Sequence, residues 1–469
     1  MTSPTAPAPA PGARLTAPPI LVTGAALLLA LSAFGSSDAA GQAIPAQEYV
    51  ERRARMMDEV PDGLLLLHAR TPEKAMEQWG WIQDGSFQYL TGLSETPGAI
   101  LVLDGPAREA RLWVSPSQPS FGGALTGIGA STGPEVASRL GLASVEEWDG
   151  FVPWVRSRIG EEVRTLYVDG SRRPEATGAP PGMQAVSGER TLWRASLEEA
   201  FPSVPITSVR EVMQRHRWAK SPAEATILYT NAQATVDAIK AVAEGLEPGM
   251  RQRATESLVV SACLAAGAQG PSFWPWTMSG PNGHSNRLFG AFYAYDNLDR
   301  EALAGEVVRV DIGCAGGGYG ADVGRTFPVS GQFTPGQAEA WNLVVAGYRA
   351  GLGAMRDGAS FAEVRAASVA EVERLAPEMR TPHGRMAAEV LVARGASVWH
   401  IHGIGIESGE EGVDPFVAGA VVAYEPTVEV GPDAFYLEDM ILITPTGHEV
   451  LSTGLPYTAQ EIEAFMRGR

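Results

Sequence analysis

Two aspartates are spaced so that a metal ion could lie between them. Asp311 stands inside the apolar, β-branched stretch Val307–Ile312, and Asp322 follows a glycine-rich turn eleven residues later. A strand, a tight turn and a returning strand would bring the two carboxylates side by side. Two neighbouring anions repel each other, and a cation between them removes that repulsion. The spacing therefore predicts a hairpin that carries a cation site.

Two glutamates and a histidine further along complete a set of metal-binding groups. Glu425 and Glu438 each stand among apolar residues that predict a strand, and His402 precedes both of them. Taken singly, each acid could equally be a solvated or salt-bridged side chain. Together, four carboxylates and one imidazole are the donors expected for two divalent ions, and Mn, Co and Zn all accept such donors.

The elements that must position these residues belong to the second of two expected domains, residues 216–469. A long helix is expected after Ser221-Pro222, because serine can cap a helix and proline suits its first turn. Arg217–Glu224 is the expected linker into this domain. The other expected elements are a strand over 307–312, helices over 337–355 and 361–375, and paired strands over 421–430 and 435–444.

A smaller α/β domain is expected over residues 44–215. Asp104-Gly105-Pro106 predicts the turn of a hairpin. Strands are expected over 63–67, 99–103, 109–114 and 165–168, after a helix-compatible stretch over 47–59. Because strands alternate with helical patterns up to about residue 205, the sequence predicts a mixed α/β (α+β) chain of two domains.

The composition excludes several classes of function. Among 469 residues, 36 Lys and Arg face 54 Asp and Glu, and the net charge of −18 disfavours binding to nucleic acid. With 45% hydrophobic and 19% charged residues, the chain can build folded cores. Two cysteines are too few for a cysteine-rich zinc site. Cys263 and Cys314 could pair in an oxidising compartment, although their spacing does not require it, and an isolated cysteine is often simply buried.

The first 43 residues have the pattern of a signal peptide. No charged residue occurs from Leu15 to Ser37, the apolar centre runs from Ile20 to Phe34, and small residues follow up to Ala43. The apolar part is shorter than the ~20 residues of a comfortable membrane span. We therefore expect a periplasmic or secreted protein, cleaved near Ala43, that meets the membrane only through this signal. An uncleaved membrane anchor is the alternative.

The motifs around these residues resemble one enzyme family. From residue 216 onward the chain resembles the pita-bread metallopeptidases, which include methionine aminopeptidase, aminopeptidase P and prolidase. Phe87-Gln88-Tyr89-Leu90-Thr91-Gly92 resembles the N-terminal domain of the aminopeptidase P and prolidase branch, which creatinase shares. The other similar motifs, in the family's order, are Lys220-Ser221-Pro222-Ala223-Glu224, Pro248-Gly249-Met250, Asp311, Asp322 with Arg325-Thr326-Phe327-Pro328-Val329, His402, Glu425 and Glu438.

This resemblance implies a fold and a role for each ligand. A pita-bread catalytic domain would follow a smaller creatinase/prolidase-like α/β domain. Asp311 would chelate one of two divalent metal ions, and His402 with Glu425 would hold the other. Asp322 and Glu438 would bridge the two ions. Glu425 would also accept a proton from the attacking water. The substrate would be a short peptide, and a homodimer is expected for this branch.

Two alignments with the family are open around His402. In the first, His402 is the metal ligand. In the second, His402 takes the place of an earlier family histidine and Ile406 falls at the ligand position. We favour the first because it completes the ligand set. It places Val398 and Gly409 where the family has histidines that help to bind substrate, so the sequence does not fix selectivity for Xaa-Pro bonds.

Three further positions bear on catalysis or on selectivity for proline. His400 could replace one of the missing histidines from a neighbouring position. His284, at the end of Ser279–His284, resembles the family histidine found upstream of the first aspartate. Tyr436 stands where the family often has an arginine. Glu425, His284 and His400 are therefore the candidate catalytic residues.

The leading hypothesis is an exported dinuclear-metal peptidase that hydrolyses N-terminal peptide bonds, with Xaa-Pro bonds as candidates. A second hypothesis is a catalytically impaired pita-bread protein that binds peptides without turnover. A creatinase-like amidinohydrolase ranks last, because that branch lacks the carboxylate ligands that this chain keeps. Neither the metal nor the substrate length follows from the sequence.

Overall fold

A computed structural model describes residues 44–70, 83–94, 96–115, 119–120, 123–124, 132–170, 189–287 and 299–468. These residues belong to one compact unit, Gln42–Arg469. The expected signal peptide and its cleavage site near Ala43 lie outside the described residues. Among the described residues, no helix combines the length and apolar character needed to cross a membrane.

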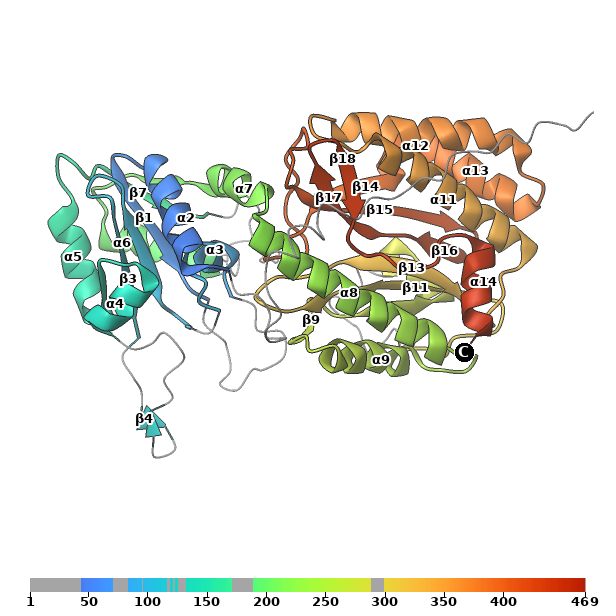
Figure 1. The fold of residues 1–469 in the computed structure, drawn as a ribbon, viewed down its shortest axis with the longest axis horizontal. Helices are drawn as coiled ribbons and strands as arrows, with labels where there is room; N and C mark the ends of the chain where they lie inside the picture. The colour runs from blue at the N-terminus through green and yellow to red at the C-terminus, as the bar shows by residue number, and fades with distance from the viewer. Residues whose placement is uncertain are drawn as a thin grey trace, which may run out of the picture. The chain divides into compact units, whose positions relative to one another are not determined.

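The first part of the described chain is built on a six-stranded mixed sheet (Figure 1). Its strands lie in the order β6-β3-β2-β1-β7-β8, with the bounds β1 (Gly63–His68), β2 (Ile100–Asp104), β3 (Glu109–Val114), β6 (Ser144–Glu147), β7 (Thr165–Val168) and β8 (Ile206–Ser208). A separate short pair is formed by β4 (Pro119–Ser120) and β5 (Gly123–Ala124). The helices of this part are α2 (Ala46–Asp58), α3 (Gly85–Thr91), α4 (Pro134–Leu140), α5 (Phe151–Arg158), α6 (Glu189–Ala200) and α7 (Arg210–Trp218).

Helices cover both faces of this sheet, which explains the uninterrupted leucines of β1. Successive side chains of a strand point to opposite faces. Leu65 packs in the core that includes α2 and α3, whereas Leu64 packs in a second core with α5 and α6. A sheet buried on both faces needs strands that are apolar throughout. The predicted α/β architecture and the hairpin of β2 and β3 are confirmed.

The second part of the chain carries the predicted site on two antiparallel sheets. One sheet has the order β10-β11-β13, and the other has the order β14-β15-β17-β18, with β16 paired to β15. The strands are β9 (Gly270–Pro271), β10 (Trp276–Ser279), β11 (Val307–Ile312), β12 (Cys314–Ala315), β13 (Val323–Pro328), β14 (Trp399–Gly403), β15 (Val421–Val430), β16 (Asp433–Tyr436), β17 (Asp439–Thr444) and β18 (Gly447–Val450). The helices are α8 (Pro222–Gly245), α9 (Gln252–Ala265), α11 (Pro335–Ala354), α12 (Phe361–Leu375), α13 (Pro382–Arg394) and α14 (Ala459–Arg467).

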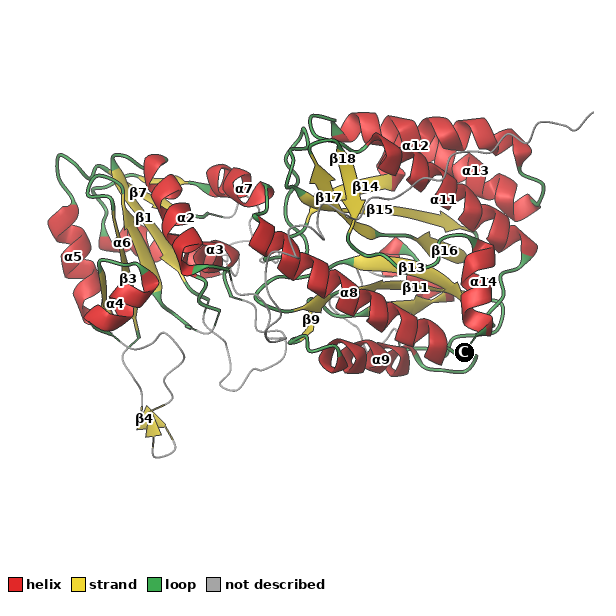
Figure 2. Cartoon of the chain, in the orientation of Figure 1, coloured by secondary structure: helices red, strands yellow, loops and turns green. Residues whose placement is uncertain are grey.

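These sheets lie between two groups of helices, as Figure 2 shows. Helices α8 and α9 contact the sheet of β10, β11 and β13, while α11, α12 and α13 contact β14 and β15. The start of α8 follows from local chemistry. The Ser221 hydroxyl accepts a hydrogen bond from the Glu224 amide, and the Glu224 side chain accepts one from the Ser221 amide. The predicted helix start after Ser221-Pro222 is confirmed.

The expected strand over 435–444 is wrong in one respect, because it is interrupted. Strand β16 ends at Tyr436 and β17 begins at Asp439. Pro426 of the facing strand β15 has no N–H to donate to a continuous ladder. Glu438 instead pairs its backbone with Gly324 of the other sheet. Glu438, a ligand candidate, therefore lies at the break, where its backbone contacts the other sheet.

The expected linker Arg217–Glu224 is mostly helical. Helix α7 ends at Trp218 and α8 begins at Pro222, so only three residues separate the two helices. The domain boundary proposed between residues 215 and 216 falls within α7 and stays a prediction.

Cys263 and Cys314 form a disulfide, with their Cα atoms 5.5 Å apart. The sequence left open whether the two cysteines pair or are separately buried, and the structure has them paired. The bond joins α9 to β12, three residues beyond Asp311.

Candidate metal centre

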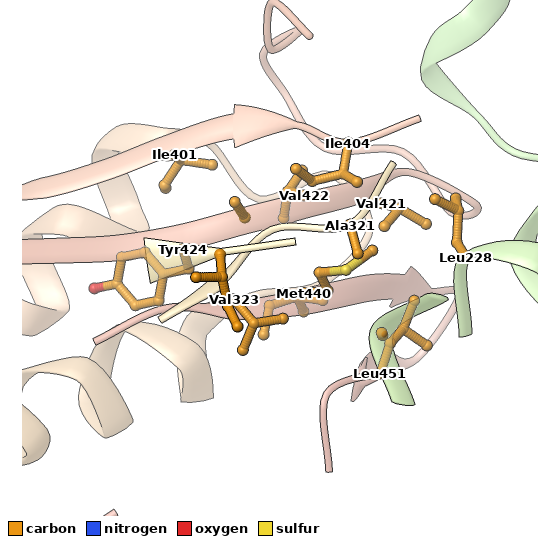
Figure 3. Close-up of a cluster of buried hydrophobic side chains, with 14 of the residues drawn as sticks. Leu228, Ala321, Val323, Ile401, Ile404, Val421, Val422, Tyr424, Met440 and Leu451 are labelled. Atoms are coloured by element: carbon orange, nitrogen blue, oxygen red, sulfur yellow. The ribbon is translucent and has the colours of Figure 1, made fainter. Parts of the chain in front are cut away.

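The β11–β13 hairpin places the two aspartates at the same end. Asp311 lies opposite Gly324 and Ile312 lies opposite Val323, so Asp322 immediately precedes the returning strand. Figure 3 shows Val323 within a cluster of buried apolar side chains, together with Ala321. Neighbouring side chains of an extended segment point to opposite sides. The Asp322 carboxylate therefore faces away from this apolar cluster, and the predicted hairpin is confirmed.

The adjacent strands β14 and β15 present His402 and Glu425 by the same alternation. His400, which stands two residues before His402, lies opposite Glu425 in the register of β14 and β15. Ile401 and Tyr424, which alternate with these polar residues, lie in the apolar cluster of Figure 3. Ile401 and Tyr424 thus point to one face of the two strands, whereas His400, His402 and Glu425 point to the other.

Four of the five predicted ligands converge on a small volume. His402 Nε2 lies 3.2 Å from Glu425 Oε1, 3.8 Å from Glu438 Oε1 and 3.9 Å from Asp322 Oδ2. Donor atoms of His402, Asp322 and Glu438 all lie within 4.8 Å of one another, as do those of His400, His402 and Glu425. Divalent ions bind such donors at ~2.0–2.2 Å, so spacings of this size can accommodate an ion.

Unsatisfied oxygen atoms support this interpretation. Asp322 Oδ1 and Glu438 Oε1 are buried and accept no hydrogen bond from the described residues. A buried carboxylate oxygen without a donor is energetically costly. Burial, followed by the charges of the neighbouring carboxylates, raises the pKa of both acids well above the usual range. Divalent cations would supply the missing charge and coordination, so the donor set fits them.

The pKa values of His402 and Glu425 reflect their contact. Burial alone would lower the pKa of His402, but the hydrogen bond and charge of Glu425 outweigh it and raise that pKa to about 9. Burial alone would raise the pKa of Glu425, but its hydrogen bonds with His400 and His402 hold that pKa well below its usual range. Because only a neutral imidazole binds metal, a metal ion and a proton compete for His402 Nε2.

Asp311 is buried, but it belongs to neither of the two three-residue groups of donor atoms. Its Oδ2 accepts a hydrogen bond from Arg309 Nη2 at 2.9 Å. Burial raises the pKa of Asp311 and the Arg309 charge opposes that rise. Asp311 stays a predicted ligand, with one of its two oxygens bound to an arginine.

Two groups lie beside the ligand candidates: Tyr436, which the sequence marked only as a departure from the family, and Arg309, which sequence reasoning missed. The Tyr436 hydroxyl lies 2.6 Å from Glu425 Oε2 and 2.8 Å from Glu438 Oε2. Arg309 stacks its guanidinium 4.0 Å from the centre of the Tyr436 ring. A signal for Arg309 was present, because a charged residue two positions before Asp311 must point to the same face of β11.

The structure does not bring His284 into the ligand group. His284 Nδ1 lies 3.5 Å from Glu429 Oε2. Glu429 follows Glu425 by four residues on β15, about 13 Å along an extended strand. His400, in contrast, contacts Glu425 directly and is more than half exposed.

The geometry favours the first of the two alignments around His402. Ile406 is 5% exposed and packs in the apolar core, where it has no donor atom to offer a metal. Val398 is buried as well, and Gly409 has no side chain. The ligand roles themselves stay predictions.

Comparison with solved structures places this arrangement in a known fold. Aminopeptidase P from Escherichia coli, solved with the inhibitor Pro-Leu, matches with a TM-score of 0.72 at 24% identity, over 91% of this chain and 99% of that chain. Proline aminopeptidase P II from Yersinia pestis matches with a TM-score of 0.72 at 23% identity, over 91% of this chain and 100% of that chain. The two-part fold is thus that of the aminopeptidase P structures.

Family models and relatives give the same classification. Residues 228–445 match the model of metallopeptidase family M24, and residues 49–127 match the aminopeptidase P N-terminal domain. The Xaa-Pro aminopeptidase of Escherichia coli (strain K12) is 27% identical over 459 residues, covering 90% of this chain and 98% of the relative. The Xaa-Pro aminopeptidase of Haemophilus influenzae is 24% identical over 453 residues, with the same coverage. Residues 228–445 thus resemble an M24 metallopeptidase domain, and the chain is an enzyme similar to Xaa-Pro aminopeptidases.

Proposed function

We propose that this protein is an exported Xaa-Pro aminopeptidase that removes N-terminal residues from short peptides with the help of two divalent metal ions. The convergence of Asp322, His402, Glu425 and Glu438, with buried oxygen atoms that accept no hydrogen bond from the described residues, carries the proposal. The names of the relatives from Escherichia coli and Haemophilus influenzae support the substrate class.

The residues that would hold the ions are Asp311, Asp322, His402, Glu425 and Glu438. When bound, the ions supply Lewis acidity at the scissile carbonyl and a hydroxide nucleophile at neutral pH. Glu425 is ionised at neutral pH because its contacts with His400 and His402 favour the charged form. Its carboxylate can therefore accept a proton beside the scissile bond and return it to the leaving amine.

A cavity of about 1220 Å³ gives a peptide room to bind. None of the five ligand candidates lines this cavity, but Gly320 and Ile406 do, two residues before Asp322 and four residues after His402 in the chain. Trp274, which is about half exposed, also lines this cavity and contributes an apolar surface to its wall. We place the peptide along this wall, because apolar side chains and proline rings gain from contact with an indole.

Hydrolysis of matched peptides tests the proposal. The metal-loaded protein should release Xaa from Xaa-Pro-Yaa faster than from Xaa-Ala-Yaa, as measured by mass spectrometry of the products. A chelator should abolish turnover, and added Mn, Co or Zn should restore it. Asp322→Ala should remove both metal binding and turnover, whereas Asp237→Ala, at an exposed helical position, should preserve both.

Other outcomes would contradict parts of this proposal. Peptide binding without turnover in the presence of each of these metals would favour the impaired, peptide-binding alternative. Metal-independent turnover would exclude the dinuclear mechanism. Export and a homodimer belong to the proposal as predictions, to be tested by N-terminal sequencing of the exported protein and by light scattering.

A further inference from the structure

Each glutamate of the centre has one oxygen turned toward His402 and the other turned toward Tyr436. Oε1 of Glu425 and Oε1 of Glu438 lie 3.2 Å and 3.8 Å from His402 Nε2. Oε2 of Glu425 and Oε2 of Glu438 lie 2.6 Å and 2.8 Å from the Tyr436 hydroxyl. The hydroxyl carries one proton, which the two Oε2 atoms share. Contact with both oxygens restricts the rotation of both carboxylates and keeps both Oε1 atoms pointed at the candidate metal position.

Tyr436 is itself held on several sides. Thr326 Oγ1 donates to the Tyr436 carbonyl at 3.0 Å and accepts from the Tyr436 amide at 2.8 Å. Gly324 leaves space for the ring, because a Cβ there would lie 2.1 Å from Tyr436 Cε1. The side chain is 1% exposed. The Tyr436 hydroxyl is therefore held in place, because the neighbouring residues fix the backbone and confine the buried ring of Tyr436.

Arg309 connects this tyrosine to the remaining ligand candidate. Its guanidinium stacks 4.0 Å from the Tyr436 ring centre, and its Nη2 donates to Asp311 Oδ2 at 2.9 Å. Arg309 lies opposite Thr326 in the β11–β13 ladder. The residue that stacks on the Tyr436 ring and the residue that bonds the Tyr436 backbone are therefore neighbours on adjacent strands. A guanidinium stacked on an aromatic ring is restricted in its orientation and can hold a carboxylate at a defined angle.

We propose that Arg309 and Tyr436 form a positioning pair for the divalent-metal centre. Tyr436 holds the outer oxygens of Glu425 and Glu438, Arg309 holds the outer oxygen of Asp311, and the stacking contact makes the two residues one unit. The pair also places one positive charge beside four carboxylates, which lessens their mutual repulsion before metal binds. This inference rests on the proposed function, because it assumes that the centre binds divalent ions.

Mn²⁺ titration of the full-length protein tests the pair without any use of peptide hydrolysis. Affinity would be measured by competition with a chromophoric chelator, and stoichiometry by elemental analysis after removal of excess metal. Tyr436→Phe keeps the ring that Arg309 stacks on and removes only the hydroxyl. We expect this variant and Arg309→Met each to bind Mn²⁺ about 10- to 100-fold more weakly, as is usual when an outer-shell partner of a ligand is lost. The fold-loss of Mn²⁺ affinity in the double variant should be smaller than the product of the fold-losses in the two single variants.

A matched control separates positioning from general destabilisation. Tyr424→Phe removes the hydroxyl of another buried tyrosine, which bonds Ser368 and not a ligand candidate. It should lower the unfolding temperature of the metal-free protein and leave the Mn²⁺ affinity unchanged. If Tyr436→Phe and Arg309→Met behave like this control, the positioning role is wrong. If the fold-loss of Mn²⁺ affinity in the double variant equals the product of the two single fold-losses, the residues act independently, and the proposal that they form one unit is wrong.

The wild-type result distinguishes this inference from the proposed function. Wild-type protein that binds no Mn²⁺ would contradict the dinuclear mechanism and the positioning pair together. Wild-type protein that binds Mn²⁺ as tightly as both variants do would contradict the positioning pair alone.

Discussion

Gly324 and Glu438 exchange two backbone hydrogen bonds, at 3.2 Å from the Gly324 amide and 3.0 Å from the Glu438 amide. This short bridge joins the hairpin that carries Asp322 to the break between β16 and β17. Glu438 is fully buried as a result, and its side chain faces the other acids and not solvent. A backbone contact between two sheets therefore assembles the centre.

Gly324→Ala should weaken metal binding through this contact. The added Cβ would lie 2.1 Å from Tyr436 Cε1 and 3.0 Å from the Val310 carbonyl oxygen, so the tyrosine ring must move. Overpacking of this kind costs about 1–3 kcal/mol of unfolding free energy. Mn²⁺ titration and urea unfolding would measure the two effects.

Gly353→Ala is the matched control for this glycine. A Cβ at Gly353 meets no atom within 4 Å, and the residue lies in α11. The substitution should stabilise the helix by up to about 1 kcal/mol and preserve Mn²⁺ affinity. An unchanged Mn²⁺ affinity in Gly324→Ala would contradict the expected displacement of Tyr436.

Reduction of the Cys263–Cys314 disulfide should destabilise the protein. The two cysteines are 51 residues apart, and closing a loop of that length restricts the unfolded chain. We expect a loss of about 2–4 kcal/mol in unfolding free energy, measured by urea unfolding with and without a reductant. A Cys263→Ala/Cys314→Ala double variant should show the lower stability in both conditions. Equal midpoints for the oxidised and reduced wild-type protein would contradict the prediction.

Stability should fall in acid because of Glu410. Burial alone would raise the pKa of Glu410, but the charges of Arg217 and Lys220 outweigh it and lower that pKa to about 2. A carboxylate whose pKa is depressed on folding stabilises the folded state above its unfolded pKa. This contribution is lost as the pH falls from about 4.5 toward 2. Its full size is on the order of 3 kcal/mol.

Glu410→Gln checks this pH dependence. The difference in unfolding free energy between wild type and variant should be largest near pH 7 and shrink steadily below pH 4.5. Glu162→Gln, at a largely exposed glutamate, should differ little from wild type at any pH. A difference for Glu410→Gln that does not depend on pH would show that lost packing, and not lost charge, causes the effect.

Trp274→Ala should raise KM for peptides without changing kcat. The indole lines the same cavity as Gly320 and Ile406 and lies outside the ligand group. Loss of an apolar contact made equally in the ground and transition states changes binding alone. We expect a KM about 10-fold higher, which corresponds to about 1.4 kcal/mol. Trp148→Ala, at another partly exposed tryptophan outside this cavity, should leave KM unchanged.

Sequence patterns were sufficient for the hairpin and for most elements around it. The alternation in Val307–Ile312, the glycine turn and the returning strand predict the β11–β13 pair because strand formation and tight turns depend on neighbouring residues. Ser221-Pro222 predicts the start of α8 for the same reason, since a capping box needs residues only three positions apart. The acids and His402 could be singled out because charged groups inside apolar stretches stand out against their surroundings.

Tertiary structure alone decided how these elements meet. The break at Glu438 depends on Pro426, which lies on the facing strand, and on Gly324, which lies in another sheet. The disulfide of Cys263 and Cys314 and the stacking of Arg309 on Tyr436 join residues more than fifty positions apart. The sequence by itself determined which side chains could bind metal, because residue type and local alternation are local properties. The position of each donor atom depends on packing between distant strands, which no local pattern encodes.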